Sequence, residues 1–184
     1  TFAAPNNDIR FEEAANAAAI IGARLFWFGA GDGELADDFE SRRKLIDIYQ
    51  EFRPTLVIAH APQDYHSDHR AASVIAEAAG WFCASAGHAG QFPALDAPPQ
   101  LWFADTIDMH QFAPGFFIDI SQYTESKEQM LACHRSQLQR GADGDFSPLD
   151  QLMKRQYEAR GAQSESAAAE AFCLHHAFKR CRAW

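Results

Sequence analysis

Long hydrophobic runs are missing from this sequence of 184 residues, and basic residues are scarce. No apolar stretch approaches the roughly 20 residues that a membrane-spanning helix needs. Lysine and arginine together number 16 against 25 aspartate and glutamate residues, so the net charge is −9. An acidic chain has no electrostatic attraction to a phosphate backbone, and we therefore expect no nucleic-acid partner.

Cysteine is also rare, with four residues and no pair at C-x-x-C spacing. Scattered thiols in a domain of this size are typical of a reducing compartment, so we expect a cytoplasmic protein without disulfides. Apolar residues make up 47% of the chain and charged residues 22%, which indicates a globular rather than a disordered protein. Residues 1–8 lack the basic and apolar regions of a secretory signal.

Apolar periodicity predicts alternating helices and strands over much of the chain. The predicted helices lie at residues 10–21, 38–52, 69–79, 125–140, 148–160 and 167–179. The predicted strands lie at residues 25–28, 56–59, 101–103 and 116–120, and the continuous apolar run 56–59 is typical of a strand covered on both faces. This order indicates one α/β domain, Rossmann-like, with a mostly parallel sheet and helices on both faces.

The densest group of polar side chains follows the predicted strand 56–59 and precedes a predicted helix, in the run Asp64-Tyr65-His66-Ser67-Asp68-His69. In open α/β sheets, ligands bind beyond the carboxyl ends of the strands. Two histidines three positions apart at a helix start can face one pocket. A capped helix with exposed histidines is the alternative interpretation, but so many titratable groups at this place favour a functional site.

Residues 53–72 resemble the second motif of the PIG-L-type, or LmbE-like, de-N-acetylases. Shorter pieces that are similar to the family's pattern are Arg10, Glu13, Asp32-Gly33, Arg42, Asp119-Ile120, Lys127, His134-Arg135-Ser136-Gln137, Arg160-Gly161 and Glu170-Ala171-Phe172. The resemblance implies a Rossmann-like fold over essentially the whole chain. It also implies a metal-dependent hydrolase, usually with zinc, that removes the acetyl group from an N-acetylated amino sugar or its conjugate.

Carried over by motif, the resemblance implies a role for each polar residue of the H-x-D-H segment. His69 would bind zinc or another divalent metal, His66 would stabilise the tetrahedral intermediate, and Asp68 would orient and polarise His66. These roles are chemically consistent, because a metal activates water, an imidazolium compensates an oxyanion, and a carboxylate raises the basicity of an imidazole. Contacts with the small-molecule substrate are expected from Asp64, Tyr65 and Arg160.

The family's first motif, A-H-P-D-D, which supplies two metal ligands and the general base, is absent from these 184 residues. We therefore expect an N-terminally incomplete domain without its first strand, which by itself is incomplete for catalysis. His60, at the end of the strand 56–59, is interpreted as a loop or supporting histidine. The alternatives are a sugar- or partner-binding relative that has lost catalysis and a plain metal-binding domain, and a homo-oligomer is left open.

Overall fold

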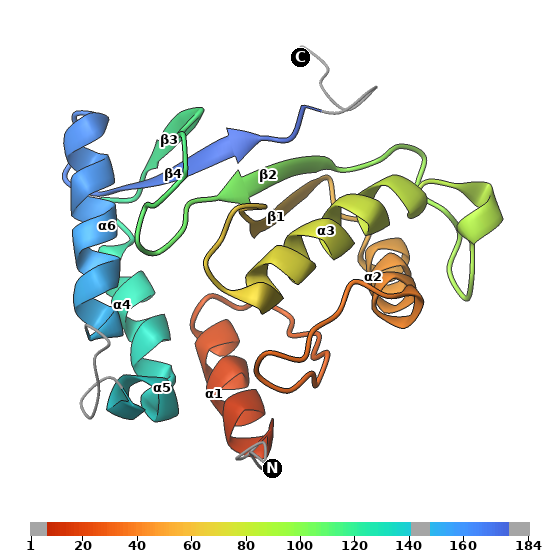
Figure 1. Cartoon of the computed structure of the whole chain (residues 1–184), viewed down its shortest axis with the longest axis horizontal. Coiled ribbons are helices and arrows are strands. Elements are labelled where there is room, and N and C mark those ends of the chain that lie inside the picture. The colour runs from red at the N-terminus through yellow and green to blue at the C-terminus, as the bar shows by residue number, and fades with distance from the viewer. Residues whose placement is uncertain (1–6, 141–147, 177–184) are drawn as a thin grey trace. The chain divides into compact units, whose positions relative to one another are not determined.

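The computed structural model describes residues 7–140 and 148–176, and the chain divides into two compact units (Figure 1). Residues 1–31 and 117–170 form what we call the helical unit, and residues 32–116 and 171–184 form the sheet unit. Each unit is described by itself. Among the described residues, no helix is both long and apolar enough to span a bilayer.

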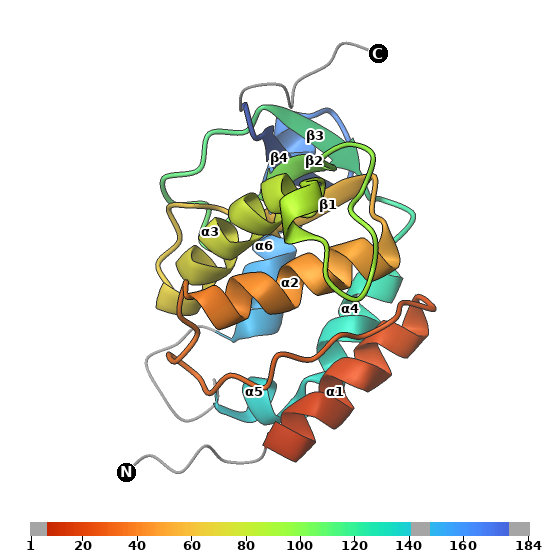
Figure 2. The ribbon, with the colours of Figure 1, turned by 90° about the vertical axis from the view of Figure 1, so that its right-hand side faces the viewer.

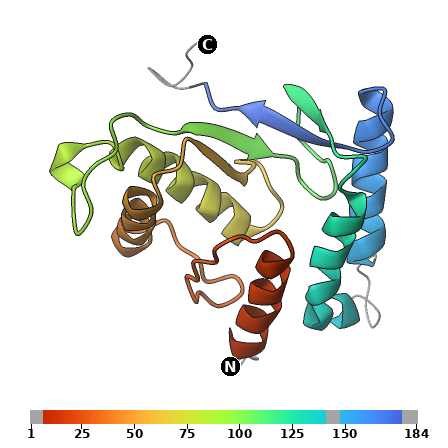
Figure 3. The same ribbon diagram turned by 180° about the vertical axis from the view of Figure 1, so that it is seen from behind.

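The helical unit is built from four helices. These are α1 (Asn7–Ile20), α4 (Thr124–Cys133), α5 (Arg135–Arg140) and α6 (Leu149–Gln163). Helix α1 packs against α4, and α4 lies beside α6 (Figure 3). The Tyr157 hydroxyl of α6 donates a hydrogen bond of 2.7 Å to Glu128 of α4. Burial and the Glu128 carboxylate together raise the pKa of Tyr157 to about 12, so this hydroxyl keeps its proton at neutral pH.

Gly161, near the end of α6, is required by a close approach of backbone. A Cβ at this position would lie 2.8 Å from the Ser166 carbonyl oxygen and 2.9 Å from the Ala168 Cα. Such separations are well below van der Waals contact, so only glycine lets the returning chain lie against the helix. This contact fixes where the chain leaves α6 and enters the next strand.

A buried carboxylate on α1 breaks the helix that the sequence predicts at residues 125–140. Glu13 is 8% exposed, and it accepts hydrogen bonds of 2.7 Å from both the backbone N–H and the hydroxyl of Ser136. In a continuous helix the Ser136 N–H would donate to the carbonyl of residue 132. Instead α4 ends at Cys133 and α5 begins at Arg135, with His134 between them. Glu13 thus satisfies a free N–H at the start of α5.

The sheet unit contains the elements on either side of the predicted polar cluster. They are α2 (Phe39–Phe52), β1 (Leu56–His60), α3 (Ser67–Phe82), a 3₁₀ turn η1 (Ala86–His88) and β2 (Gln100–Ala104). Helices α2 and α3 lie side by side (Figure 2), and α3 packs on β1 and β2. The apolar core between them is formed by Ile46, Tyr49, Ala79, Cys83 and Leu95.

The sheet has four strands in the order β1-β2-β4-β3, completed by β3 (Phe116–Asp119) and β4 (Ala169–Leu174). Strands β1 and β2 are parallel, with Ile58 opposite Trp102 and His60 opposite Ala104. Strand β4 runs antiparallel to β2. The predicted α/β class is confirmed, with a sheet that is parallel at its start and antiparallel between β2 and β4.

Two predicted elements are wrong. Residues 25–28 form no strand in the described structure, where Trp27 meets Phe11 of α1 edge-on and Arg24 lies over the Phe26 ring. The predicted helix 167–179 is instead the strand β4 as far as residue 174, and residues 177–179 lie outside the described residues. The alanine run favours a helix only weakly, and pairing with β2 outweighs that preference.

Strand β1 is not covered on both faces, contrary to the expectation from its apolar sequence. Helix α3 covers the face with Val57 and Ala59, whereas Leu56 is 37% and Ile58 53% exposed on the other face. An apolar run of four residues fits a strand but does not reveal how many faces are covered. Among the described residues, this face of β1 stays open.

We predict that Glu13→Ala lowers the free energy of unfolding by about 1–2 kcal/mol, because the Ser136 N–H then lacks its acceptor. Burial raises the pKa of Glu13. The hydrogen bonds from Ser136 and the positive charges of His134 and Arg10 lower it by more, so the net pKa of Glu13 is lowered. The stabilisation should therefore persist above the ordinary glutamate pKa of about 4.3 and vanish as the pH falls through the lowered value. Urea unfolding at several pH values measures this.

The control for this experiment is Glu12→Ala, which removes an exposed carboxylate from the same turn of α1. It should change stability by less than about 0.5 kcal/mol. Equal losses in the two variants would show that the contact between Glu13 and Ser136 contributes nothing specific.

Candidate metal and catalytic site

Polar side chains gather where β1 ends and α3 begins. His60 is the last residue of β1, and Ser67 is the first of α3. Because β1 and β2 are parallel, their carboxyl ends lie at the same edge of the sheet. The six residues between strand and helix therefore lie where α/β proteins bind their ligands.

His66 forms the N-cap of α3. Its backbone is extended, with φ −86° and ψ 132°, and its Nδ1 accepts the Asp68 N–H at 3.2 Å. The cap satisfies one of the free N–H groups at the helix start. The imidazole of His66 is thereby fixed at the edge of the sheet, with its side chain 30% exposed.

The buried carboxylate of Asp64 connects the turn after β1 to the first turn of α3. Its side chain is only 4% exposed, and Oδ1 accepts the His66 N–H at 2.9 Å and lies 3.0 Å from His69 Nδ1. Arg70 closes the same turn from outside, because its Nη1 donates to the carbonyls of Asp64 at 2.7 Å and Tyr65 at 2.8 Å. His69 Nδ1 therefore faces the Asp64 carboxylate, and when this nitrogen carries the lone pair the two atoms can bind the same metal.

His60, which the sequence interpretation left in a supporting role, stacks on His69. The ring centroids are 4.0 Å apart and the planes differ by 3°. The residue is exposed as a whole, but its ring is crowded by this stack. Desolvation and the charges of His69 and His66 lower the pKa of His60, and the Asp64 carboxylate opposes them. The ring of His60 is therefore neutral at physiological pH.

His60, Asp64 and His69 fit a divalent metal by their chemistry. Each offers one ligand atom, and these atoms lie within 4.8 Å of one another. Two imidazoles and a carboxylate are donors that zinc accepts at about 2.0–2.2 Å, with three protein ligands usual for a catalytic site. Donors around a tetrahedral zinc are then about 3.4 Å apart.

Asp68 and Asp32 lie on the other side of His66. The Asp68 carboxylate accepts the Gly33 N–H at 2.8 Å, so it holds the loop before α2. Asp32 Oδ1, from the same loop, lies 3.4 Å from His66 Nε2. The residue beside the outer ring nitrogen of His66 is therefore Asp32, whereas the expected partner Asp68 contacts that ring through its backbone N–H.

Tyr65 lies over both histidines, and Arg160 lies in the other unit. The Tyr65 ring meets His66 and His69 edge-on at 5.8 and 5.9 Å, and the residue is 60% exposed. Desolvation and the charges of Asp64, Asp108 and Asp32 raise the pKa of Tyr65, so its phenol keeps its proton. Arg160 is buried in α6 at 5% exposure, and its Nη1 donates to Gln163 at 2.8 Å.

The structure thus brings together five of the six predicted site residues. These are Asp64, Tyr65, His66, Asp68 and His69. Sequence reasoning placed His60 near the pocket in a supporting role and not as a possible ligand, and it missed Arg70 as the clamp of the turn. The position of His60 at the carboxyl end of a strand, four residues before Asp64, was the available signal. Arg70 had no signal, because its role rests on backbone carbonyls.

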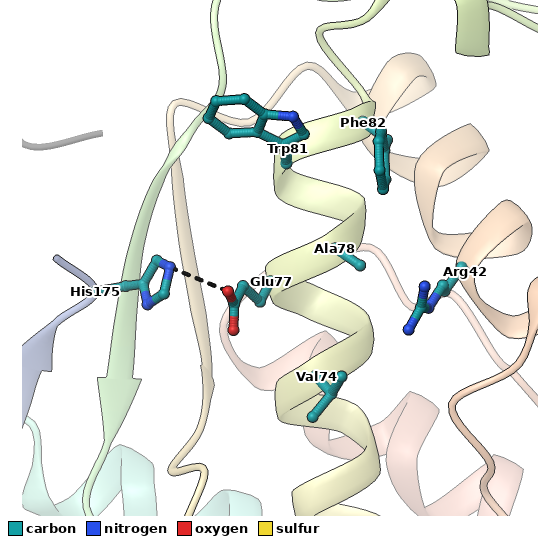
Figure 4. Close-up of a pocket in the computed structure, with 7 residues that line it drawn as sticks. All are labelled: Arg42, Val74, Glu77, Ala78, Trp81, Phe82 and His175. Atoms are coloured by element: carbon teal, nitrogen blue, oxygen red, sulfur yellow. Dashed lines mark ion pairs between the residues drawn. The ribbon is translucent and has the colours of Figure 1, made fainter. Parts of the chain in front are cut away.

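A shallow hollow of about 350 Å³ lies along the outer side of α3, away from this cluster (Figure 4). Its lining consists of Arg42, Val74, Glu77, Ala78, Trp81, Phe82 and His175. Figure 4 shows that Glu77 and His175 face each other, and Glu77 Oε1 lies 3.5 Å from His175 Nε2. None of the cluster residues lines the hollow. The two groups of possible metal ligands among the described residues both lie by the start of α3 instead.

The site and fold together define an α/β protein with a histidine–carboxylate cluster at the carboxyl end of a parallel strand. Residues 5–80 match the PIG-L family, described as GlcNAc-PI de-N-acetylase. The resemblance found in the sequence is confirmed by this match.

A curated relative, the 4-oxalmesaconate hydratase of Pseudomonas putida KT2440, is 30% identical over 132 residues. The alignment covers 71% of this chain and 51% of the relative, so the chain spans about half the length of the curated relative that it matches. The segment that matches the PIG-L family model contains α1, α2, β1, most of α3 and the cluster at the start of α3.

Solved structures share the fold over most of the chain. The conserved protein TT1542 from Thermus thermophilus superposes with a TM-score of 0.77 at 26% identity, over 99% of this chain and 81% of that one. The N,N'-diacetylchitobiose deacetylase from Pyrococcus horikoshii gives a TM-score of 0.76 at 21% identity, over 91% of this chain and 63% of that one. At that identity the second likeness shows the fold alone.

We predict that His66→Ala lowers the free energy of unfolding by about 1 kcal/mol, because α3 loses its N-cap acceptor. His66→Asn should keep most of the stability, since asparagine is a favoured N-cap residue, although it removes the imidazole. Urea unfolding measures both variants. If asparagine destabilises as much as alanine, the cap is not what His66 contributes to the fold.

Proposed function

We propose that this chain is part of a divalent-metal-dependent hydrolase that removes the acetyl group from an N-acetylated amino sugar or its conjugate. The single observation that carries the proposal is the cluster of His60, Asp64 and His69 beside His66, within the segment that matches the PIG-L family. The family description names a de-N-acetylase, which supports the same reaction.

In this reaction water adds to the acetyl carbon, the C–N bond breaks, acetate leaves and the amine nitrogen takes up a proton. His60, Asp64 and His69 would hold the metal, which when bound polarises the carbonyl and lowers the pKa of water. His66 can donate a hydrogen bond to the oxygen where negative charge develops. The Tyr65 phenol, which keeps its proton, is a second donor at the same edge. The resemblance assigns two metal ligands and the general base to the A-H-P-D-D motif, which these residues do not contain. His69 is the ligand on which the resemblance and the cluster agree.

A second candidate reaction is the addition of water to a carbon–carbon double bond of an unsaturated carboxylate. It is favoured by the relative at 30% identity, which is named a hydratase. Both reactions need an activated water and a donor for an oxygen that becomes negative. The same cluster, formed by His60, Asp64, His69 and His66, therefore suits either reaction, and an assay with both kinds of substrate distinguishes them.

We predict that zinc binding depends on the three proposed ligands. His69→Ala and His60→Ala should each weaken zinc affinity by at least about tenfold, because a three-ligand site loses one donor. Calorimetric titration of full-length protein, or cobalt substitution followed by visible absorption, measures this without any substrate. His88→Ala is the matched control, since this histidine stacks on Phe82 and belongs to neither ligand group. Unchanged affinity in His60→Ala would remove His60 from the ligand set.

We predict that the full-length zinc-loaded protein releases acetate from N-acetylglucosamine conjugates. His69→Ala should abolish this release, and His66→Asn should lower kcat by about 10²–10³ with the helix cap retained. Acetate release and the new amine are measured together. His88→Ala should retain full activity.

The outcomes of this assay separate the candidates. Loss of ultraviolet absorbance from a conjugated unsaturated dicarboxylate, without acetate release from amino sugars, would establish the hydratase reaction instead. Zinc binding without either reaction would favour the non-catalytic binding relative.

A further inference from the structure

The two ring nitrogens of His66 have different partners in this structure. Nδ1 accepts the Asp68 N–H at 3.2 Å and forms the cap of α3. An acceptor nitrogen carries no proton, so a neutral imidazole in this position carries its proton on Nε2. The helix start thereby selects the tautomer of His66.

The protonated nitrogen of His66 faces a carboxylate from a distant part of the chain. Asp32 Oδ1 lies 3.4 Å from His66 Nε2, although the two residues are 34 positions apart. The Asp32 side chain is 63% exposed, so burial does not force it into this place. What holds its loop is the bond of 2.8 Å from the Gly33 N–H to Asp68 Oδ2.

Asp68 therefore acts on His66 by two routes. Its backbone N–H fixes Nδ1, and its carboxylate holds the loop that presents Asp32 to Nε2. Gly33 has φ +82°, a conformation that side chains disfavour, and a Cβ there would meet nothing within 4 Å. Glycine is therefore favoured at this position by its backbone conformation and not by lack of space. In this conformation the Gly33 N–H points toward the Asp68 carboxylate.

We propose that Asp32 is a positioning residue: it attracts the Nε2–H of His66 and orients the ring until the substrate oxygen accepts this N–H in its place. The proposal rests on the proposed function, in which His66 donates to a developing oxyanion. Nε2 is the ring nitrogen that can reach a substrate, because Nδ1 is occupied by the helix. A carboxylate beside this N–H attracts it and so orients the ring.

A metal ion held by Asp32, His66 and Asp68 is the competing interpretation, since their ligand atoms also lie within 4.8 Å of one another. A metal on Nε2 would require the proton to move to Nδ1. The ring could then no longer accept the Asp68 N–H, and α3 would lose its cap. The cap therefore favours a hydrogen-bond donor over a metal ligand at His66.

The first test uses nitrogen-15 NMR of histidine-labelled full-length protein, at a pH where the ring is neutral. His66 should show the Nε2–H tautomer in both the zinc-free and the zinc-loaded protein. Asp32→Ala should keep this tautomer but shift the ring signals of His66, because the ring is no longer held. An Nδ1–H tautomer, coordination of zinc by Nε2, or unchanged signals in Asp32→Ala would each overturn the proposal.

The second test uses activity on whichever substrate the protein turns over. Asp32→Ala should lower kcat by about tenfold or more with little change in KM, and Asp32→Asn, which can still accept the N–H, should restore most of it. Gly33→Ala should lower kcat similarly, because the strained loop withdraws Asp32. Gly22→Ala is the matched control, since this glycine also has φ +65° and open space at its Cβ, and its kcat should be unchanged.

Failure of this proposal differs from failure of the proposed function. If no substrate is turned over, the proposed function fails, and the NMR result alone decides the role of Asp32. If the protein is active and Asp32→Ala retains full kcat, the positioning role is wrong while the reaction stands.

Discussion

The buried carboxylate of Asp64 is the constraint on which the site depends. One Asp64 oxygen accepts the His66 N–H and lies beside His69 Nδ1. The same carboxylate therefore contacts both the loop after β1 and the first turn of α3. A carboxylate at 4% exposure is costly unless its hydrogen bonds are made, and here the backbone and an imidazole supply them. With Asp64 fixed, the rings of His60, His66 and His69 have little freedom to separate.

The cluster also shows how one helix start can serve structure and chemistry together. His66 caps α3 with Nδ1 and leaves Nε2 toward the open side, while His69, one turn further, lies against Asp64. The centroids of the two rings are 4.8 Å apart, so both imidazoles lie on the same side of the helix start.

Much of the sheet unit follows from local sequence. The helix 38–52 was predicted within one residue of α2 from its apolar periodicity, and in the structure Asp38 caps it by accepting the Ser41 N–H at 2.8 Å. Elements with strong local signals of this kind were confirmed, as were the strands at 56–59 and 101–103. Elements that depend on distant partners were not: the break at His134 requires Glu13, and the strand β4 requires β2.

The sequence by itself determined the α/β class, the place of the site and the pair His66 and His69, because spacing within a short segment is a local property. Tertiary structure alone decided that His60 stacks on His69, that Asp32 lies beside His66 and that Asp68 holds Gly33. These contacts join residues up to 35 positions apart. No local pattern encodes such contacts, since they arise only when packing brings a loop, a strand end and a helix start to the same edge of the sheet.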